Sequence, residues 1–425
     1  MRRFASIAFV VLGGCATLPP APARYEIVGY YPGWKGKIEI DARQLTVLNY
    51  AFLDICWDGQ HGNPSEGALA PCRDIDGNAI TPPNGSVVVD NPSVDRANLA
   101  ALPALKAANP SLKLVASVGG WSRSNRFSDM AANGITRGNF IESVVAFLRR
   151  HAFDGIDIDW EYPTSIGVRC ATGYNCDRAT DKQNFVVLAR ELRSALDAVG
   201  VADGKHYLST IAAGNDRSFV VDPSGSGAWI SDLAAHLDWI NLMTYDYHGT
   251  WEMSAGFLAP HYRDPADPAP ANVDATVTLY LRQGIPARKL TLGMPFYGKG
   301  WKGCAPGPGG DGLYQPCTGL ADVPEAAFEF AQLTEKGYLV KDAKGKYTVG
   351  GLGFTRHWNS AARAPYLYKA TTGEFITYDD EASIHEKNAY VVKHGLRGAM
   401  FWELNADRHR VLGTVVSQDL PHISR

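Results

Sequence analysis

The sequence predicts an α/β fold, most simply a (β/α)8 barrel with a small α+β insertion between its seventh and eighth strands. Short runs of β-branched and aromatic residues alternate with helical segments through most of the chain. The last two of these strands are separated by roughly 100 residues, whereas such connections usually have two to six. A doubly wound sheet is the alternative, but no Gly-x-Gly-x-x-Gly follows the first strand, so nothing indicates a dinucleotide site.

The individual elements are assigned in chain order. The expected barrel strands are Glu26–Tyr31, Thr46–Leu53, Lys113–Gly119, Gly155–Trp160, Tyr207–Ala213, Trp239–Tyr245, Leu290–Tyr297 and Gly398–Trp402. The expected helices are Val94–Ala108, Arg137–His151, Asp181–Val199, Asp274–Arg282 and Ala382–His394. Apolar residues in these helices recur at the three- and four-residue spacing of one helix face, as in Phe140, Val144 and Phe147.

The expected domain boundaries follow from this pattern. Residues 1–24 form a leader and linker, residues 25–300 and 376–425 form the two parts of the barrel, and residues 301–375 form the insertion. The segment from Asp54 to Asp90 is also long, polar and rich in Gly and Pro. Because barrels place their active sites among the loops that follow the strands, we expect both excursions to build walls beside such a site.

The N-terminus has the features of a targeting segment. Arg2 and Arg3 precede a short apolar run, Phe4 to Leu12, which is too short to span a bilayer. The run ends in Leu-Gly-Gly-Cys at Cys15, which resembles the lipobox of bacterial lipoproteins, whose Cys is lipidated. The resemblance implies an exported, outer-membrane lipoprotein; the alternative is a secreted protein cleaved near residues 21–23.

The cysteine count agrees with export. Seven cysteines are present, and assigning Cys15 to a lipid leaves six. These fall as neighbours in the sequence: Cys56 and Cys72, Cys170 and Cys176, Cys304 and Cys317. Disulfides between neighbours are expected in an oxidising compartment, although the sequence does not fix the connectivity. No Cys-x-x-Cys is present, and neither a metal site nor a cofactor is expected.

The composition limits the classes of molecule that the protein is expected to bind. The net charge of -3 gives no electrostatic case for nucleic acid or for an anionic membrane surface. We therefore expect membrane contact only through the lipid anchor, and we expect a monomer. Part of the 10 Trp and 19 Tyr belongs to the core, but such an excess of aromatics also suits stacking against sugar rings.

A row of acids occupies the expected fourth strand. Asp157, Asp159 and Glu161 stand at alternate positions, so they share one face of a strand, with Ile156 and Ile158 on the other. Buried carboxylates are tolerated only when they are paired, hydrogen-bonded or neutralised. The alternatives are a solvent-facing edge strand and an acidic cation site.

The three acids suit general acid catalysis. Glu161 comes at the carboxyl end of the strand, where barrels carry catalytic residues, and the other two lie deeper. Like charges about 6.5 Å apart cannot all ionise cheaply, so the acids are expected to share a proton and to have raised pKa values. Glu161 would then be protonated near neutral pH, as a general acid must be.

Two further segments close expected strands. Met243 and Tyr245 would share a face of the sixth strand, and Asp246 would begin the next loop. Tyr245 would donate a hydrogen bond beside the acids, although a core Tyr followed by a turn Asp is the plainer reading. In Ser117-Val-Gly-Gly120-Trp121, the glycines allow close backbone approach and Trp121 suits stacking on a sugar.

These motifs resemble those of glycoside hydrolase family 18, the chitinase family. The Asp-x-x-Asp-x-Asp-x-Glu signature is present from Asp154 to Glu161, with Ser-x-Gly-Gly at Ser117 and Met-x-Tyr-Asp at Met243. The resemblance extends from about Tyr25 to about Asp407. Lys299 departs from it, because many relatives have Arg there, and a Lys cannot make a bidentate contact.

The resemblance implies chitin or chitooligosaccharides as the substrate and a retaining, substrate-assisted hydrolysis. Glu161 would be the acid and base, Asp159 would orient the acetamide nitrogen of the substrate, Asp157 would hold Asp159, and Tyr245 would bind the acetamido oxygen. The residues implied to bind substrate or support the acids are Tyr30, Phe52, Ser117, Gly120, Trp121, Met243, Asp246, Trp251, Tyr297 and Trp402. The alternatives are an endo-N-acetylglucosaminidase or peptidoglycan-directed glycosidase, and a chitin-binding lectin, although lectins on this fold lose the acid equivalent to Glu161.

Overall fold

The computed structural model describes residues 24–422, apart from residues 68, 173 and 223–226. Cys15 and the rest of the expected leader lie outside the described residues. None of the helices in the described part of the chain is both long and apolar enough to cross a membrane.

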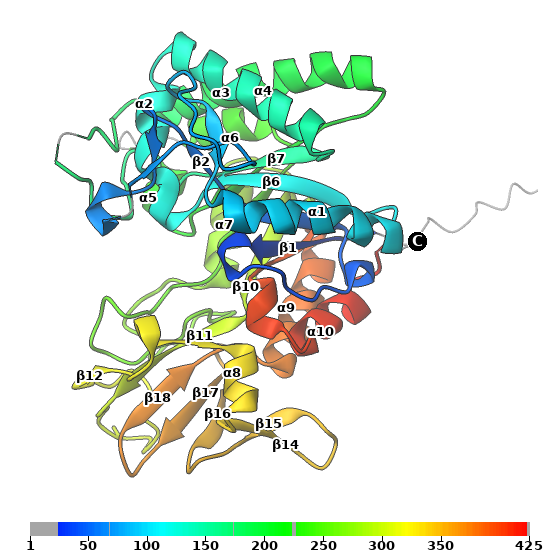
Figure 1. Ribbon diagram of the computed structural model, residues 1–425. Helices are drawn as coiled ribbons and strands as arrows, with labels where there is room; N and C mark the ends of the chain where they lie inside the picture. The colour runs from blue at the N-terminus through cyan, green and yellow to red at the C-terminus, as the bar shows by residue number, and fades with distance from the viewer. Residues whose placement is uncertain (1–23, 68, 173, 223–226, 423–425) are drawn as a thin grey trace, which may run out of the picture.

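Eight parallel strands form a closed barrel, as predicted (Figure 1). Each strand pairs with its neighbours in chain order, and β1 pairs with both β2 and β19, which closes the ring. The barrel strands are β1 (Glu26–Pro32), β2 (Val47–Ile55), β6 (Lys113–Gly119), β7 (Gly155–Asp159), β8 (Leu208–Ala213), β9 (Trp239–Leu242), β10 (Leu290–Pro295) and β19 (Gly398–Trp402). The doubly wound alternative is therefore wrong.

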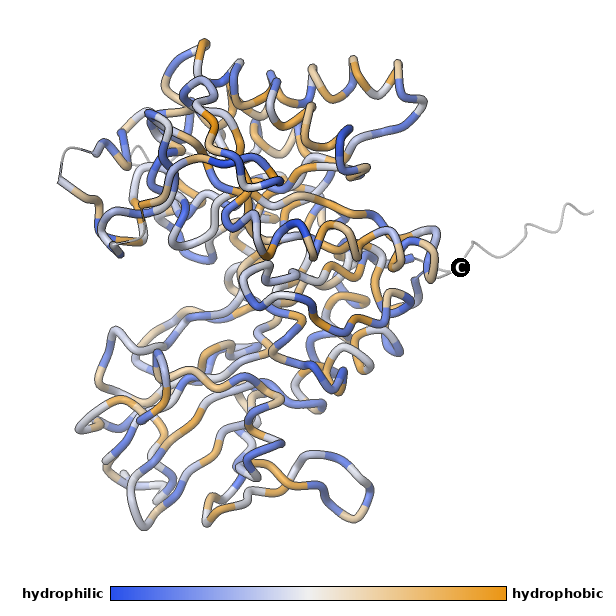
Figure 2. The backbone as a smooth tube through the Cα atoms, in the orientation of Figure 1, coloured by the Kyte–Doolittle hydropathy of each residue, from blue (hydrophilic) through white to orange (hydrophobic). Residues whose placement is uncertain are grey.

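Helices surround the barrel. All five predicted helices are present, and α2, α5, α6, α8 and α10 were not predicted, because they are short and their apolar periods are brief. The helices are α1 (Pro92–Ala108), α2 (Phe127–Ala131), α3 (Gly134–Arg150), α4 (Asp181–Asp203), α5 (Arg217–Val220), α6 (Ala228–Ala235), α7 (Val273–Arg282), α8 (Phe330–Glu335), α9 (Glu381–His394) and α10 (Val411–Asp419). Hydrophobic and hydrophilic residues alternate along them in Figure 2, as expected of helices with one buried face.

A second, antiparallel sheet follows β10 and lies below the barrel in Figure 1. Its strands are β11 (Tyr297–Lys302), β12 (Gly319–Leu320), β13 (Ala327–Glu329), β16 (Thr355–Asn359), β17 (Ala364–Lys369) and β18 (Glu374–Thr377), and a hairpin of β14 (Leu339–Lys341) and β15 (Tyr347–Gly350) projects beside it. The seventh barrel strand ends at Pro295, so the prediction that it reached Tyr297 is wrong. Tyr297 instead begins β11, where it pairs with Glu329.

Two separate apolar clusters lie on the two faces of the barrel strands. One cluster lies between the strands and the helices and contains Ile156, Ile158 and Trp160. A smaller cluster contains Tyr30, Val115, Trp239 and other residues that alternate with these along the strands. The alternation predicted for the fourth strand therefore places its acids on the face opposite to the helices.

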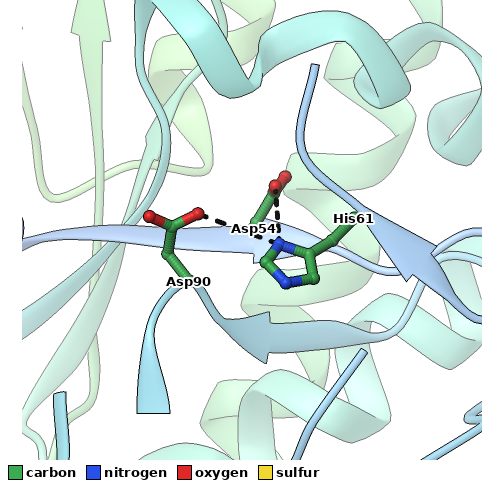
Figure 3. A group of neighbouring side chains, drawn as sticks. All are labelled: Asp54, His61 and Asp90. Carbon is green, nitrogen blue, oxygen red and sulfur yellow. Dashed lines mark hydrogen bonds and ion pairs between the residues drawn. The ribbon is translucent and has the colours of Figure 1, made fainter. Parts of the chain in front are cut away.

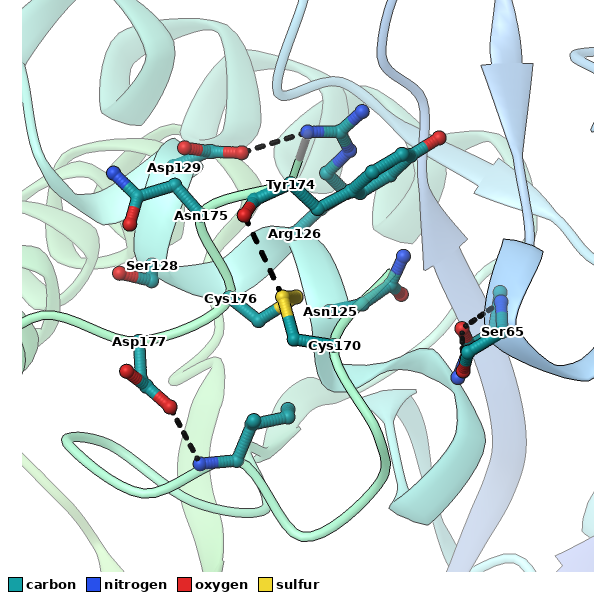
Figure 4. Close-up of a disulfide and its surroundings, with 12 residues drawn as sticks. Ser65, Asn125, Arg126, Ser128, Asp129, Cys170, Tyr174, Asn175, Cys176 and Asp177 are labelled. Atoms are coloured by element: carbon teal, nitrogen blue, oxygen red, sulfur yellow. Dashed lines mark hydrogen bonds and ion pairs between the residues drawn. A yellow bond between two sulfur atoms is a disulfide. The ribbon is translucent and has the colours of Figure 1, made fainter. Parts of the chain in front are cut away.

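The three disulfides between sequence neighbours are confirmed: Cys56–Cys72, Cys170–Cys176 (Figure 4) and Cys304–Cys317. The first closes part of the excursion after β2, which also contains β3 (Gln60–His61), β4 (Ala70–Pro71) and β5 (Val87–Val89). The third closes a loop between β11 and β12. Each crosslink therefore lies in a long connection rather than in the barrel wall.

A buried ion pair joins the second sheet to the helix that returns to the barrel. Lys387 of α9 donates to Asp379, which follows β18 by two residues, and both side chains are at most 1% exposed. Asp379 also accepts from the Ser383 hydroxyl at 2.7 Å. Removing one member of such a pair leaves the other charge buried without compensation.

We expect Lys387→Met to reduce the free energy of unfolding by about 3–5 kcal/mol, measured by chemical denaturation. Lys393→Met, on the exposed side of the same helix, is the control and should change it by less than about 0.5 kcal/mol. A loss below about 1 kcal/mol for Lys387→Met would show that the pair does not stabilise this junction.

Candidate active site

The three predicted acids lie together inside the carboxyl end of the barrel. Asp157 and Asp159 belong to β7, and Glu161 follows the strand by two residues, because β7 ends one residue earlier than predicted. Their exposed fractions rise toward the barrel mouth, from 0% for Asp157 through 4% for Asp159 to 8% for Glu161. Since β7 lies between β6 and β8, the solvent-facing edge-strand alternative is wrong.

Asp157 has the most hydrogen-bond partners of the three acids. Its carboxylate accepts hydrogen bonds from the side chains of Tyr30 at 2.9 Å, Ser117 at 2.8 Å, Thr210 at 2.6 Å and Asn241 at 3.2 Å. Burial raises the pKa of Asp157, and these hydrogen bonds, led by that of Thr210, oppose the rise. The sequence pointed to Tyr30 and Ser117 but not to Thr210 or Asn241.

Asp159, in contrast, has a buried carboxylate oxygen, Oδ1, without a hydrogen-bond partner among the described residues. Burial raises the pKa of Asp159 well above its usual value, and the charges of Glu161 and Asp157 raise it further. Ionisation of Asp159 is therefore disfavoured relative to an exposed Asp, and the residue has an unused polar atom beside Glu161.

Glu161 is held by its main chain and has a raised pKa. Its N–H donates to Ser124 Oγ at 2.8 Å, and its carbonyl accepts from Gly167 N–H at 3.0 Å. Burial raises the pKa of Glu161 to about 7, the Tyr162 hydroxyl lowers it, and the charge of Asp246 raises it. The carboxyl is thus partly protonated near neutral pH, as acid and base catalysis by one group requires.

Tyr245 joins the acids although the sixth strand stops short of it. The prediction that Met243 and Tyr245 share a strand face is wrong, because β9 ends at Leu242. The chain then makes a turn, in which Thr244 N–H donates to the Leu242 carbonyl and Tyr245 N–H donates to the Met243 carbonyl. Asn215 fixes this turn by donating to the carbonyls of Met243 and Tyr245. Burial, followed by the charges of Asp159 and Glu161, raises the pKa of Tyr245 well above its usual value, so its hydroxyl is a donor at neutral pH.

Asp246 and Tyr297 form one hydrogen-bonded pair. The Tyr297 hydroxyl donates to Asp246 Oδ1 at 2.8 Å, and the Tyr297 and Tyr245 rings meet edge to face with centroids 6.2 Å apart. Asp246 is exposed and has a φ of 56°. The second sheet, which begins at Tyr297, therefore contributes directly to the site.

The two glycines after Ser117 are required by close contacts. Gly119 has a φ of 107° and Gly120 a φ of 81°. A Cβ atom on Gly119 would lie 2.3 Å from the Asp159 carbonyl oxygen, and one on Gly120 would lie 2.5 Å from the Phe52 ring. Glycine at both positions thus lets β6 end directly against β7 and against the Phe52 ring.

Trp402, Phe52 and Trp34 form a group of neighbouring aromatic rings, called the aromatic floor. The Trp402 ring lies 5.6 Å from Tyr30, 5.6 Å from Phe52 and 6.0 Å from Trp34, measured between centroids. Phe52 sits at an irregularity in the pairing of β2 with β6. Trp34 is 51% exposed, and we did not predict it as a site residue. It lies two residues beyond the first strand, and this position at the carboxyl end of a barrel strand could have indicated it.

The predicted Trp121 and Trp251 stand on the surface, 51% and 63% exposed. Trp121 begins the 3-10 helix η4 (Trp121–Arg126) after β6, and its ring lies against Gly167. Trp251 lies in the connection after β9, which the second sheet supports: Trp301 Nε1 donates to the Glu252 carbonyl at 2.9 Å. These exposed indoles are available to a ligand that enters from solvent.

A polar cluster of Asp54, His61 and Asp90 has the donor set of a metal site (Figure 3). One ligand atom from each lies within 4.8 Å of the others. However, Arg123 Nε is 2.9 Å from Asp90 Oδ1 and 3.5 Å from Asp54 Oδ2, so a guanidinium already supplies the cation there. We interpret the cluster as an ion-pair network that ties the excursion after β2 to η4.

The raised pKa of Glu161 makes stability depend on pH. An acid whose folded-state pKa is raised costs nothing while it stays protonated, and it destabilises the fold as the pH rises from 4.5, its ordinary pKa, to about 7. We expect Glu161→Gln to unfold at the same denaturant concentration as the wild type below about pH 4.5 and to be more stable by about 3 kcal/mol at pH 8. Glu142→Gln, on the exposed face of α3, controls for the lost charge; a Glu161→Gln difference that did not grow with pH would contradict the assigned pKa.

Comparisons with known proteins show the family of the chain. The family model for "Glycosyl hydrolases family 18" matches residues 26–407. The chain is 41% identical to Chitinase A1 of Niallia circulans over 98% of this chain and 62% of that protein, so it spans less than two thirds of that relative's length. The solved chitinase ChiA74 of Bacillus thuringiensis is 38% identical, with a TM-score of 0.82 over 95% of this chain and 71% of that one. A family 18 N-acetylglucosaminidase of Paenibacillus barengoltzii is 32% identical, with a TM-score of 0.72 over 93% of this chain and 100% of that one. The chain belongs to glycosyl hydrolase family 18.

Proposed function

We propose that the protein is a chitinase that cleaves β-1,4-linked N-acetylglucosamine polymers and retains the anomeric configuration. The observation that carries this proposal is the contrast between the acids of β7: Asp157 is fully hydrogen-bonded, Asp159 has an unpartnered buried oxygen, and Glu161 has a pKa of about 7 at the barrel mouth. Similarity to Chitinase A1 and to ChiA74 supports the choice of substrate.

The proposed first step is substrate-assisted. Glu161 gives its proton to the glycosidic oxygen, and the C1–O bond breaks as the carbonyl oxygen of the substrate's own 2-acetamido group bonds to C1. The product is an oxazolinium ion and a free sugar hydroxyl. Tyr245 would donate a hydrogen bond to the acetamido oxygen, and its raised pKa keeps its hydroxyl protonated.

Asp159 is proposed to stabilise the positive acetamido group. Since its Oδ1 has no protein partner, the side chain can turn toward the acetamide nitrogen without breaking a hydrogen bond made by that atom. Asp157 has four donors and would lose them by moving, so it stays fixed. In the second step Glu161 takes a proton from a water molecule. The water oxygen bonds to C1, and the bond between C1 and the acetamido oxygen breaks, which opens the oxazolinium ring.

A conventional second carboxylate is not needed in this scheme. Asp246 is the residue that would have to act as a nucleophile, but the Tyr297 hydroxyl binds one of its oxygens. We assign Asp246 and Tyr297 to substrate binding, together with the floor of Trp402, Phe52 and Trp34 and the exposed Trp121 and Trp251. We also propose that the segment expected at residues 301–375 forms one wall of the cleft, because it supports the Trp251 connection.

Export to the outer membrane is proposed on the Leu-Gly-Gly-Cys pattern at Cys15 and on the three disulfides. We expect Cys15→Ser to abolish incorporation of labelled fatty acid and to move the protein from the membrane fraction to the soluble fraction. A plain secretory signal would instead leave the wild type unlabelled.

We expect Glu161→Gln to fold normally and to lose at least about 10³-fold in kcat on chitooligosaccharides, because the amide cannot donate the proton. Asp159→Asn should lose almost as much, since an amide has no charge for the oxazolinium. Circular dichroism provides the control for folding. Near-wild-type turnover by Glu161→Gln would contradict the assignment, and a mild effect of Asp159→Asn would contradict the role of Asp159.

A substrate panel separates the alternatives. Release of sugar from chitin, from high-mannose glycopeptide and from cell-wall sacculi distinguishes a chitinase from an endo-N-acetylglucosaminidase and from a peptidoglycan-directed enzyme. Binding without turnover would indicate a lectin. Cello-oligosaccharides, which have the same linkage without the acetamido group, should remain uncleaved if the mechanism is substrate-assisted.

A further inference from the structure

We propose that Ser124 is a positioning residue for Glu161, an inference that rests on the proposed function. Ser124 lies in η4, is 0% exposed and is separated from Glu161 by 37 positions in the sequence. Its Oγ atom accepts the Glu161 N–H at 2.8 Å and points its own proton at two carbonyl oxygens, those of Gly120 at 2.9 Å and Asp159 at 3.2 Å.

One hydroxyl therefore binds the chain on both sides of Trp160. The strand hydrogen bonds of β7 stop at Asp159, so the Glu161 main chain has no partner strand. Gly167 N–H holds the Glu161 carbonyl at 3.0 Å, and Ser124 holds its N–H. These two contacts fix the peptide units from which the catalytic carboxyl projects, and only the one from Ser124 involves a side chain.

The element that carries Ser124 is itself anchored on several sides. Arg123 pairs with Asp90, and Asn125 Nδ2 donates to the Gly62 carbonyl at 3.1 Å, both in the excursion after β2. The Arg126 guanidinium lies over the Tyr174 ring at 3.8 Å, inside the loop closed by Cys170–Cys176 (Figure 4). Its other ring neighbour is Trp57, beside Cys56, at 5.3 Å.

This anchoring gives Ser124 a fixed position relative to the barrel. Both disulfide-closed loops contact the Arg126 side chain of η4, and the Cys56–Cys72 loop also accepts a hydrogen bond from Asn125. Neither loop touches Glu161 through a side chain that the described hydrogen bonds record. Their effect on the acid is transmitted through Ser124 Oγ and through the Gly167 main chain. A small displacement of the acid is costly, because proton transfer requires the carboxyl within hydrogen-bond reach of the glycosidic oxygen.

The test compares two buried serines. Ser124→Ala removes the acceptor of the Glu161 N–H, whereas Ser128→Ala, in α2, removes an equally buried hydroxyl that bonds Asp181 and Arg178. We expect Ser124→Ala to lower kcat on a chitooligosaccharide by about 10- to 100-fold with KM changed by less than about threefold, and to move the alkaline limb of the pH profile of kcat/KM. Ser124→Thr keeps the hydroxyl and should restore most of kcat.

The proposal is overturned if Ser124→Ala keeps kcat within about threefold of wild type, or if Ser128→Ala lowers kcat equally without moving the pH profile. If Ser124→Ala does not fold, Ser124→Cys, a near-isostere with a weak acceptor, is judged by the same criteria. If the wild type cleaves no substrate, the proposed function fails, and Ser124 is then tested by stability. The pH-dependent stability difference between wild type and Glu161→Gln should shrink when Ser124→Ala is added to both; an unchanged difference overturns the positioning role.

Discussion

Asp157 accepts hydrogen bonds from four side chains, which project from β1, β6, β8 and β9. The strands on both sides of β7 thereby converge on one fully buried carboxylate. Without these donors an ionised group at this depth would be too costly to bury, and with them it becomes a fixed point in the barrel. Its charge also raises the pKa of Asp159, two residues further along the strand.

The difference among the three acids is therefore one of surroundings rather than residue type. Asp157 has donors for both oxygens, Asp159 has a buried oxygen with none, and Glu161 lies near the mouth, where substrate can reach it. A pKa that differs along one strand assigns one role to each group. The same arrangement costs folding free energy, because the raised pKa values mean that ionisation is disfavoured in the folded state.

The sequence predicted the barrel, the row of acids and the disulfide pairs well, because each depends on a local pattern: alternation in strands, periodicity in helices, and short cysteine spacings. It failed where position depends on the closed barrel. Thr210 and Asn241 are ordinary strand residues whose role appears only when β8 pairs with β7 and β9 pairs with β8 in the closed barrel. The end of β9 at Leu242 was missed, because the polar turn that follows is held by Asn215, from a different connection. Ser124 carries no signal in the sequence, since its partner is a main-chain N–H 37 residues away.

The second sheet contacts the candidate site and influences its electrostatics. Tyr297 is the first residue of β11, and its hydroxyl binds Asp246, whose charge raises the pKa of Glu161. Lys299, two residues along the same strand, lies 5.8 Å from the Tyr297 ring centroid and brings a positive charge to the same corner. The position of β11 relative to the barrel thus affects how readily Glu161, the proposed catalytic acid, keeps its proton. Because β11 is tied back to the barrel through Trp301 and the Glu252 carbonyl, the same strand that supports the exposed Trp251 also adjusts the electrostatics of Glu161.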